Sequence, residues 1–182
     1  SEVTSNTVTI GNAPPSVSSV SISPDPVQAG DTLTCAWSGY SDSDGDADQS
    51  TAAWALNGTA TASGTSWSGG AFVRGDTVTC TVSPYDGSDT GTDVDETLTV
   101  ENTAPTVSTV SISPTSASVG DTLTCSYSGY SDVDGDSDNS SMSWTINGTS
   151  AGSGTTLSSG FVRGDSVACN VTTTYNTVFP IH

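Results

Sequence analysis

The chain contains the same sequence unit twice, and this internal repeat limits the available folds more than any other feature. Residues 12–56 align with residues 102–146 without a gap, and the match resumes after a one-residue deletion. The shared segments include GDTLTC at 30–35 and 120–125 and FVRGD at 72–76 and 161–165. Two homologous units of about 90 residues follow. Each is so small that its core usually needs covalent or metal reinforcement.

Short segments with apolar residues at every second position predict β-strands throughout the chain. Ser and Thr are abundant, and Gly, Pro, Asn and Asp separate the segments, which favours strands and turns over helices. In the first unit we expect strands at 16–23, 32–37, 52–56, 59–63, 77–82 and 97–100. Asn57-Gly58, repeated as Asn147-Gly148, predicts a type I′ hairpin turn. The predicted fold class is therefore all-β, with two tandem sandwiches.

Four cysteines stand at matching positions of the two units. Of the three connectivities, the repeat favours Cys35–Cys80 and Cys125–Cys169. Free thiols or a metal site are the alternatives, but there is no CxxC spacing and His182 is the single histidine. Paired cysteines indicate an oxidising compartment, and the sequence contains no signal peptide or membrane span. We therefore expect a secreted, extracellular protein.

Each unit has a tryptophan between its two cysteines and a second aromatic residue two positions after the first cysteine. These residues are Trp54 and Trp37 in the first unit and Trp144 and Tyr127 in the second. In this Cys…Trp…Cys pattern the chain resembles immunoglobulin-like domains, specifically the tandem Ig-like or PKD-like repeats of large prokaryotic surface proteins. The resemblance implies two immunoglobulin-like sandwiches. One departure is that Val78 and Val167 replace the tyrosine two residues before the second cysteine.

One loop in each unit carries an aspartate at every second position. The aspartates are Asp42, Asp44, Asp46 and Asp48 in the first unit and Asp132, Asp134, Asp136 and Asp138 in the second. Four carboxylates within seven residues repel one another unless a hard cation collects them, and calcium takes six to eight oxygens. In an extended run all four would face one side, but Gly45 is expected to bend the loop. The sequence predicts a Ca²⁺ site in each unit, with Asp86 completing the first; a solvated polar loop is the alternative.

The aspartate runs are similar to the calcium loops of dockerins and thrombospondin-type repeats, although the EF-hand spacing is absent. The second unit has no counterpart of Asp86, so we expect its site to be weaker or differently completed. Magnesium is a poorer candidate because it rarely uses all-protein cages.

The charge balance excludes several classes of function. The formal net charge is −18, with no lysine and only two arginines, so nucleic acid is not an expected partner and membrane insertion is not expected either. There is no internal histidine and no cysteine left over to act as a nucleophile. We therefore expect a structural protein and not an enzyme.

Two short motifs carry less weight. Residues 74–76 and 163–165 spell the integrin-type tripeptide Arg-Gly-Asp, but Gly-Asp also opens strands at 30–31 and 120–121, so the motif is first a turn. Four asparagines lie in N-glycosylation sequons and are candidate sites for glycans. They are Asn57, Asn139, Asn147 and Asn170.

The repeat starts and stops out of phase. Residues 93–102 form the last strand of the first unit, and residues 3–12 align with them, so that Val8 and Ile10 fall on Leu98 and Val100. The expected organisation is an N-terminal donor strand at 1–12, an Ig-like domain at 13–102, and a second Ig-like domain at 103–182 that lacks its last strand. The donor strand would use Thr4, Val8 and Ile10.

A sandwich without its last strand exposes a groove and an unpaired edge, which the donor strand of another copy would fill. The contact is heterologous, so the expected assembly is a head-to-tail homopolymer. In this respect the chain resembles pilus-like extracellular fibrils built by strand exchange. The alternatives are a piece of a tandem-repeat adhesin or stalk, a carbohydrate-binding role that uses Trp67, and a fold-back of Asn176–Ile181 into the vacancy.

Overall fold

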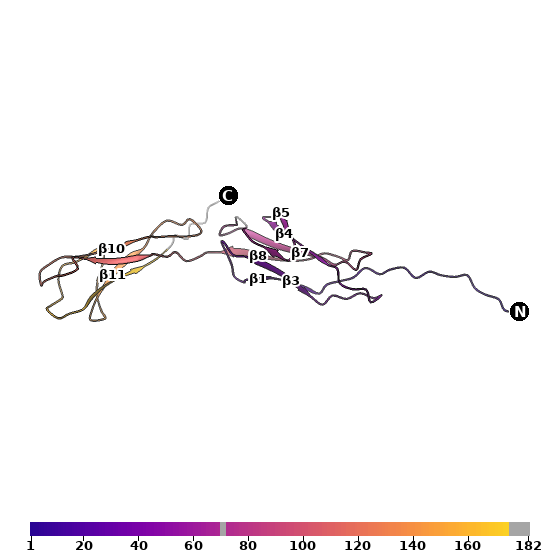
Figure 1. Ribbon diagram of the computed structural model, residues 1–182, viewed down its shortest axis with the longest axis horizontal. Coiled ribbons are helices and arrows are strands. Elements are labelled where there is room, and N and C mark those ends of the chain that lie inside the picture. Colours follow the sequence, from indigo (N-terminus) through magenta and orange to yellow (C-terminus); the bar gives the residue numbers. More distant parts are fainter. Residues whose placement is uncertain (70–71, 175–182) are drawn as a thin grey trace. The chain divides into compact units, whose positions relative to one another are not determined.

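The structure, a computed structural model, describes residues 1–69 and 72–174. The chain divides into two compact units, unit 1 (Ser1–Glu101) and unit 2 (Asn102 onward). Every regular element of the described residues is a strand, and none is a helix (Figure 1). The predicted all-β class is confirmed.

Unit 1 has a sandwich-like arrangement of two sheets. The smaller sheet has the order β1-β3-β6, with β1 (Ser19–Ser23), β3 (Leu33–Ser38) and β6 (Ser66–Trp67). The larger sheet has the order β2-β8-β7-β4-β5, with β2 (Val27–Gln28), β8 (Val94–Glu101), β7 (Thr77–Ser83), β4 (Thr51–Leu56) and β5 (Thr59–Ser63). All neighbouring strands are antiparallel except β2 and β8, which are parallel.

The core of unit 1 lies between the two sheets. Along β7 every second side chain points inward, and Val78, Cys80 and Val82 are fully buried. The Cys35–Cys80 disulfide joins β3 to β7 and so ties one sheet to the other. Trp54 of β4 packs in the same cluster, and its indole N–H donates to the carbonyl of Gly64 at 2.9 Å, which satisfies its one polar group.

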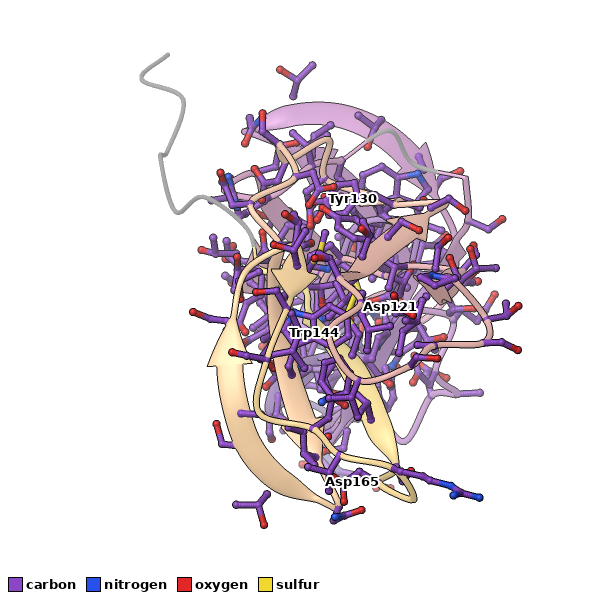
Figure 2. The ribbon with its side chains drawn as sticks, turned by 90° about the vertical axis from the view of Figure 1, so that its left-hand side faces the viewer. Asp121, Tyr130, Trp144 and Asp165 are labelled. Atoms are coloured by element: carbon purple, nitrogen blue, oxygen red, sulfur yellow. A yellow bond between two sulfur atoms is a disulfide. The ribbon has the colours of Figure 1, made fainter. Side chains whose placement is uncertain are left out.

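Unit 2 repeats this plan with fewer strands. One sheet has the order β13-β10-β9, with β13 (Thr156–Leu157), β10 (Leu123–Ser128) and β9 (Thr109–Ser113). The other has the order β12-β11-β14, with β12 (Thr149–Ser153), β11 (Ser141–Ile146) and β14 (Val167–Thr172). The Cys125–Cys169 disulfide joins them, and Trp144 lies in the middle of the unit (Figure 2). Within the described part of unit 2, no strand corresponds to β2 or β8.

The predicted strands occur with shifted ends. The first begins at Ser19 because Ser16 makes only an isolated bridge with Ser41, and β8 extends beyond the predicted 97–100 at both ends. The two-residue strands β2 and β6 were not predicted, since two residues cannot show a period. Both hairpin turns are confirmed, because Asn57 and Asn147 have φ values of 49° and 51°, as a type I′ turn requires.

Removal of the disulfides should affect the two units unequally. Each bond closes a loop of 45 or 44 residues, which stabilises a domain by about 4 kcal/mol on the chain-entropy argument. Unit 2 has the smaller buried core and therefore less stability in reserve. The double variant Cys125→Ala/Cys169→Ala should leave unit 2 unfolded at room temperature, whereas Cys35→Ala/Cys80→Ala should leave unit 1 folded with a lower Tm. Calorimetry with two-dimensional NMR distinguishes the units, and a cooperative unit 2 transition in the first variant would contradict this expectation.

Candidate functional site

The aspartate loop of unit 1 follows β3 and is built as a tight turn around its first carboxylate. Asp42 Oδ1 accepts hydrogen bonds from the backbone N–H groups of Asp44 and Asp46 at 2.9 and 3.1 Å. Gly45 has a φ of +85°, a conformation that glycine adopts without strain. Asp42 is therefore part of the turn itself.

The loop of unit 2 has the same construction. Asp132 Oδ1 accepts from the N–H groups of Asp134 and Asp136 at 2.8 and 3.2 Å, and Gly135 has a φ of +77°. The equal spacing of the aspartates in the two sequences thus produces equal local structure.

The four aspartates of this loop do not all face one side, because the chain bends at Gly45. Asp48 is directed at the start of β4 and at Trp37, since it accepts from Ser50 N–H at 2.8 Å and from the Trp37 indole N–H at 3.0 Å. Asp44 Oδ2 instead accepts from Ala13 N–H at 2.7 Å. The turn at Gly45 breaks the period of two, and each carboxylate satisfies a different backbone or indole donor. Within residues 1–69 and 72–174, no three acidic, histidine or cysteine side chains converge closely enough to hold a metal ion.

Three carboxylate oxygens in these loops are nevertheless buried without a hydrogen-bond donor. They are Asp42 Oδ2, Asp132 Oδ2 and Asp134 Oδ1. A buried, unpaired carboxylate oxygen is costly, and a hard cation is the partner that oxygen donors of this kind prefer. The donor chemistry fits calcium, although the side chains would have to move together to bind it.

The negative charge of each loop acts on a nearby tyrosine. Burial, and then the charges of Asp42, Asp86, Asp48 and Asp46, raise the pKa of Tyr40. In unit 2 burial and the charge of Asp132, followed by Asp138 and Asp136, raise the pKa of Tyr130. Burial is the larger cause in both cases and the aspartate charges add to it. The clustered carboxylates themselves give this end of each unit a negative potential, which attracts cations.

Asp86 lies at this same end of unit 1 but is already engaged. Its side chain is only 6% exposed, and it accepts hydrogen bonds from the Asn12 side chain at 2.8 Å and from the N–H groups of Ser88 and Asp89 at 2.6 and 2.7 Å. These bonds, with that from Asn12 the largest influence, lower the pKa of Asp86. Asn12 also donates to Asp89 Oδ2 at 2.9 Å.

Sequence reasoning missed this role of Asn12. The signal was available, because Asn12 aligns with Asn102 at the start of unit 2. In unit 1 the loop that contains Asp86 binds Asn12, and the aspartate loop binds Ala13 through Asp44. In unit 2 Thr103 N–H donates to Asp134 Oδ2 at 2.7 Å, the counterpart of the Ala13 bond. Each aspartate loop therefore holds the peptide that leads into its unit.

The Arg-Gly-Asp segments use their aspartates as structural clasps. Asp76 accepts from the Asn57 side chain at 2.8 Å and from Val73 N–H at 2.9 Å, and Asn57 Oδ1 accepts from Thr77 N–H at 2.9 Å. Asp165, Asn147, Val162 and Ser166 repeat these bonds in unit 2. Both aspartates and the side chains of two sequon asparagines thus lock a hairpin turn to a neighbouring turn.

The other two sequon asparagines are not part of these clasps. Asn170 is exposed on β14, and Asn139 is exposed with a contact of 3.5 Å from its amide to the Ser137 carbonyl. Trp67, the candidate for carbohydrate binding, is buried instead, at 8% exposure, and packs against Trp54 and Phe72. That expectation is wrong because the short strand β6 turns the indole into the core.

Among the described strands, unit 2 has an open sheet edge at the position where unit 1 is closed. In unit 1 β7 lies between β4 and β8, but in unit 2 β14 pairs only with β11 among the described strands. Val167, Cys169 and Val171 of β14 are partly exposed, although their counterparts on β7 are fully buried. The inward face of β14 therefore has incomplete cover.

A groove of about 770 Å³ lies at this edge. Its lining includes Ile112, Leu123, Phe161, Gly164, Asp165 and Val167. In Figure 2 Asp165, which lines the groove, lies at the bottom of the view, and Tyr130, close to the aspartate loop, lies towards the top.

The segment before unit 1 is exposed along its length. Residues 1–11 form no strand and run as an extended trace away from the strands of unit 1 (Figure 1). Val3, Val8 and Ile10 are 91%, 77% and 84% exposed. The fold-back expected of Asn176–Ile181 lies outside the described residues.

No protein-family profile matches the chain, and a search of curated proteins finds no match. The two disulfides indicate an oxidising, non-cytoplasmic environment. Across residues 1–69 and 72–174, there is no helix with the length and hydropathy needed to cross a membrane.

The Asp165 clasp should titrate below the ordinary aspartate range. The bonds from Val162 N–H and the Asn147 side chain lower the pKa of Asp165 from its ordinary value of 3.8. A carboxyl group with a depressed folded-state pKa stabilises the fold fully above the unfolded pKa, and this stabilisation is lost as the pH falls through the folded value. Carboxyl NMR titration should therefore give Asp165 a midpoint under 3.8 that rises in Asn147→Ala and is unchanged in the control Asn139→Ala. An Asp165 midpoint insensitive to Asn147→Ala would refute the clasp.

Proposed function

We propose that the chain is a structural, non-catalytic subunit of an extracellular filament. In this proposal immunoglobulin-like units, stabilised by calcium at their aspartate loops, join head to tail. The leading segment of one copy completes the sandwich of unit 2 in the next copy. The proposal rests chiefly on one observation among the described residues, the open edge of β14 beside a groove whose lining is partly apolar, with Arg163 and Asp165 also in it.

The leading segment, residues 4–11, has a sequence suited to pair with the open edge of β14. Residues 4–11 align with β8, and Val8 and Ile10 take the places of Leu98 and Val100. Both side chains are largely exposed in the single chain. Burial of each would contribute about 1.5–3 kcal/mol, and the edge of β14 would gain backbone hydrogen bonds.

The immunoglobulin-like assignment is supported by the arrangement of the core. In each unit a disulfide joins the two sheets, and a buried tryptophan from a central strand belongs to the same core cluster as the disulfide. This combination is typical of immunoglobulin-like sandwiches. These features support an immunoglobulin-like fold whether or not the chain forms a filament.

Calcium is supported by the unpartnered loop oxygens and by the negative potential at the tyrosines. Asp42 and Asp132 would be central ligands, since each holds its turn with Oδ1 and has Oδ2 buried without a donor. A bound calcium ion would neutralise the repulsion among the loop carboxylates. Because the same loops hold Ala13 and Thr103, it would also stabilise the start of each unit.

A tandem-repeat cell-surface adhesin or stalk is the second candidate function. It is favoured by the continuity of the repeat, because β8 of unit 1 leads directly into unit 2. In such an array the strand that fills the groove of a unit comes from the same polypeptide. The two candidates therefore differ in whether the groove binds another molecule.

Filament formation should depend on the inward side chains of the leading segment. The variant Val8→Asp/Ile10→Asp, or deletion of residues 1–11, should reduce the assembly to monomers because charged side chains cannot enter an apolar groove. Analytical ultracentrifugation and electron microscopy of the full chain measure the outcome.

The matched control is Thr7→Asp/Thr9→Asp, which adds the same charge at alternate positions of the same segment. Its counterparts in β8, Thr97 and Thr99, are exposed, so this variant should still assemble. Monomeric wild-type protein across the accessible concentrations would support the tandem-array candidate instead.

Calcium should raise the thermal stability of the wild-type chain. At a concentration 100 times its Kd, one bound ion stabilises a folded unit by about 2.7 kcal/mol. The variant Asp42→Asn/Asp132→Asn should lose this effect, because asparagine retains the Oδ1 acceptor of each turn but replaces the buried Oδ2. Scanning calorimetry with calcium and with a chelator measures the difference.

The control Asp25→Asn/Asp93→Asn removes the same amount of charge from exposed positions outside the loops. It should keep the full calcium-dependent rise in Tm. Equal calcium responses in the two double variants would show that general charge screening, and not a loop site, causes the stabilisation.

A further inference from the structure

The groove of unit 2 corresponds to surface that β8 covers in unit 1. Ile112, Leu123, Phe161 and Val167 line the groove. Ile112 and Val167 are only partly buried, whereas Leu123 and Phe161 are buried, at 4% and 9% exposure. Their counterparts, Ile22, Leu33, Phe72 and Val78, are all 6% exposed or less, and β1, which carries Ile22, packs against β8. Unit 1 therefore provides a template, within the same molecule, for the strand that unit 2 would bind.

Backbone groups at the groove are left without the partners that their counterparts have. In unit 1 Val100 N–H donates to the Asp76 carbonyl at 2.8 Å, and Gly75 N–H donates to the Val100 carbonyl at 2.9 Å. The equivalent groups of Asp165 and Gly164 make no such bonds to described residues.

The segment equivalent to β2 is also incomplete. Val27 and Gln28 form a strand only through their parallel pairing with Val100 and Glu101. In unit 2 the residues at these positions, Ala117 and Ser118, lie at the groove but are not in a strand. One extended segment could therefore pair with Ala117 and Ser118 on one side and with β14 on the other, as β8 pairs with β2 and β7 in unit 1.

We propose that residues 4–11 of a second copy bind this groove in the register that β8 has on β7. This inference rests on the proposed filament and specifies its contact residue by residue. In unit 1 Val78 pairs with Leu98 and Thr79 with Thr97. The same register places Val8 beside Val167, Thr7 beside Ala168, and Ile10 beside Ala117.

Charge favours this segment as a ligand supplied by another molecule. β8 contains Asp95, Glu96 and Glu101, whereas residues 3–12 carry no charged side chain. Two copies with a formal net charge of −18 each repel one another at long range. An uncharged strand adds nothing to that repulsion at the contact.

The anchoring of Asn12 favours a second copy over the chain's own unit 2. Asn12 is fixed to Asp86, near the start of β8, whereas unit 2 continues from Glu101 at the other end of that strand. An eight-residue strand is about 26 Å long. Residues 4–11 therefore leave unit 1 at the end opposite to Glu101, the residue from which the chain continues into unit 2.

A disulfide between copies tests the register directly. Thr7→Cys in one chain and Ala168→Cys in another place exposed cysteines opposite each other. Ala168 directly precedes Cys169, but successive side chains of a strand point to opposite faces, so its side chain points away from the Cys125–Cys169 disulfide. After mixing and mild oxidation, this pair should give covalent dimers on non-reducing gels. Ser5→Cys or Thr9→Cys with Ala168→Cys should give at least about tenfold less. A two-residue shift of about 6.8 Å along the strand, combined with the separation of about 5 Å between the strands, places the two Cα atoms beyond disulfide reach.

The outcomes separate the register from the filament itself. Wild-type assembly with dimers equally abundant in the shifted pairs overturns the proposed register and leaves the filament standing. A concentration-independent bond within a single Thr7→Cys/Ala168→Cys chain overturns the second copy as partner. Absence of both assembly and cross-links overturns the register and the proposed function together. Unchanged Tm values of the single variants confirm that each one is folded.

Discussion

The pairing of β7 with β8 is the interaction on which the rest of unit 1 depends. β8 supplies hydrogen-bond partners for the edge of β7, on which Val78, Cys80 and Val82 are buried, and it packs against β1 of the other sheet. It also creates β2, which exists only as its parallel neighbour. Unit 2 shows the effect of its absence among the described residues. The corresponding side chains of β14 are partly exposed, and the segment equivalent to β2 has no regular structure. Closure of the edge and burial of the core are therefore one event, since the same strand accomplishes both.

The aspartate loops connect this architecture to the way that the units follow one another. Each loop is a turn around a single carboxylate, Asp42 or Asp132, and a neighbouring aspartate holds the peptide leading into the unit. The loops thus hold the residues at which each sandwich begins, Ala13 and Thr103. The junction inside the chain, at Thr103, and the start of unit 1, at Ala13, are built alike. Under the proposed function, the contact between subunits would reproduce the connection between units within one chain.

Several short motifs in this chain have structural roles that differ from the functions their sequences suggest. The Arg-Gly-Asp aspartates and the Asn-Gly asparagines form clasps between two turns, as Asp76 and Asn57 show. Trp67 completes the core instead of presenting an exposed aromatic face. In a domain of about 90 residues with a small core, side chains that can satisfy turns or fill space are used for that purpose. Chemistry inferred from a short motif therefore has to be checked against the donors that surround it.

The sequence by itself determined the all-β class, the two units, both disulfides and the Asn-Gly hairpins. These features depend on short-range periodicity, on backbone conformations that few residues adopt, and on an internal repeat that pairs equivalent cysteines. Only the tertiary structure decided where the carboxylates point. The Gly45 turn directs Asp44 to Ala13 and Asp48 to Trp37, donors that lie in other segments and follow no local period. The role of Asn12 and the shape of the groove were decided in the same way, because each depends on which distant segments the two sheets bring together.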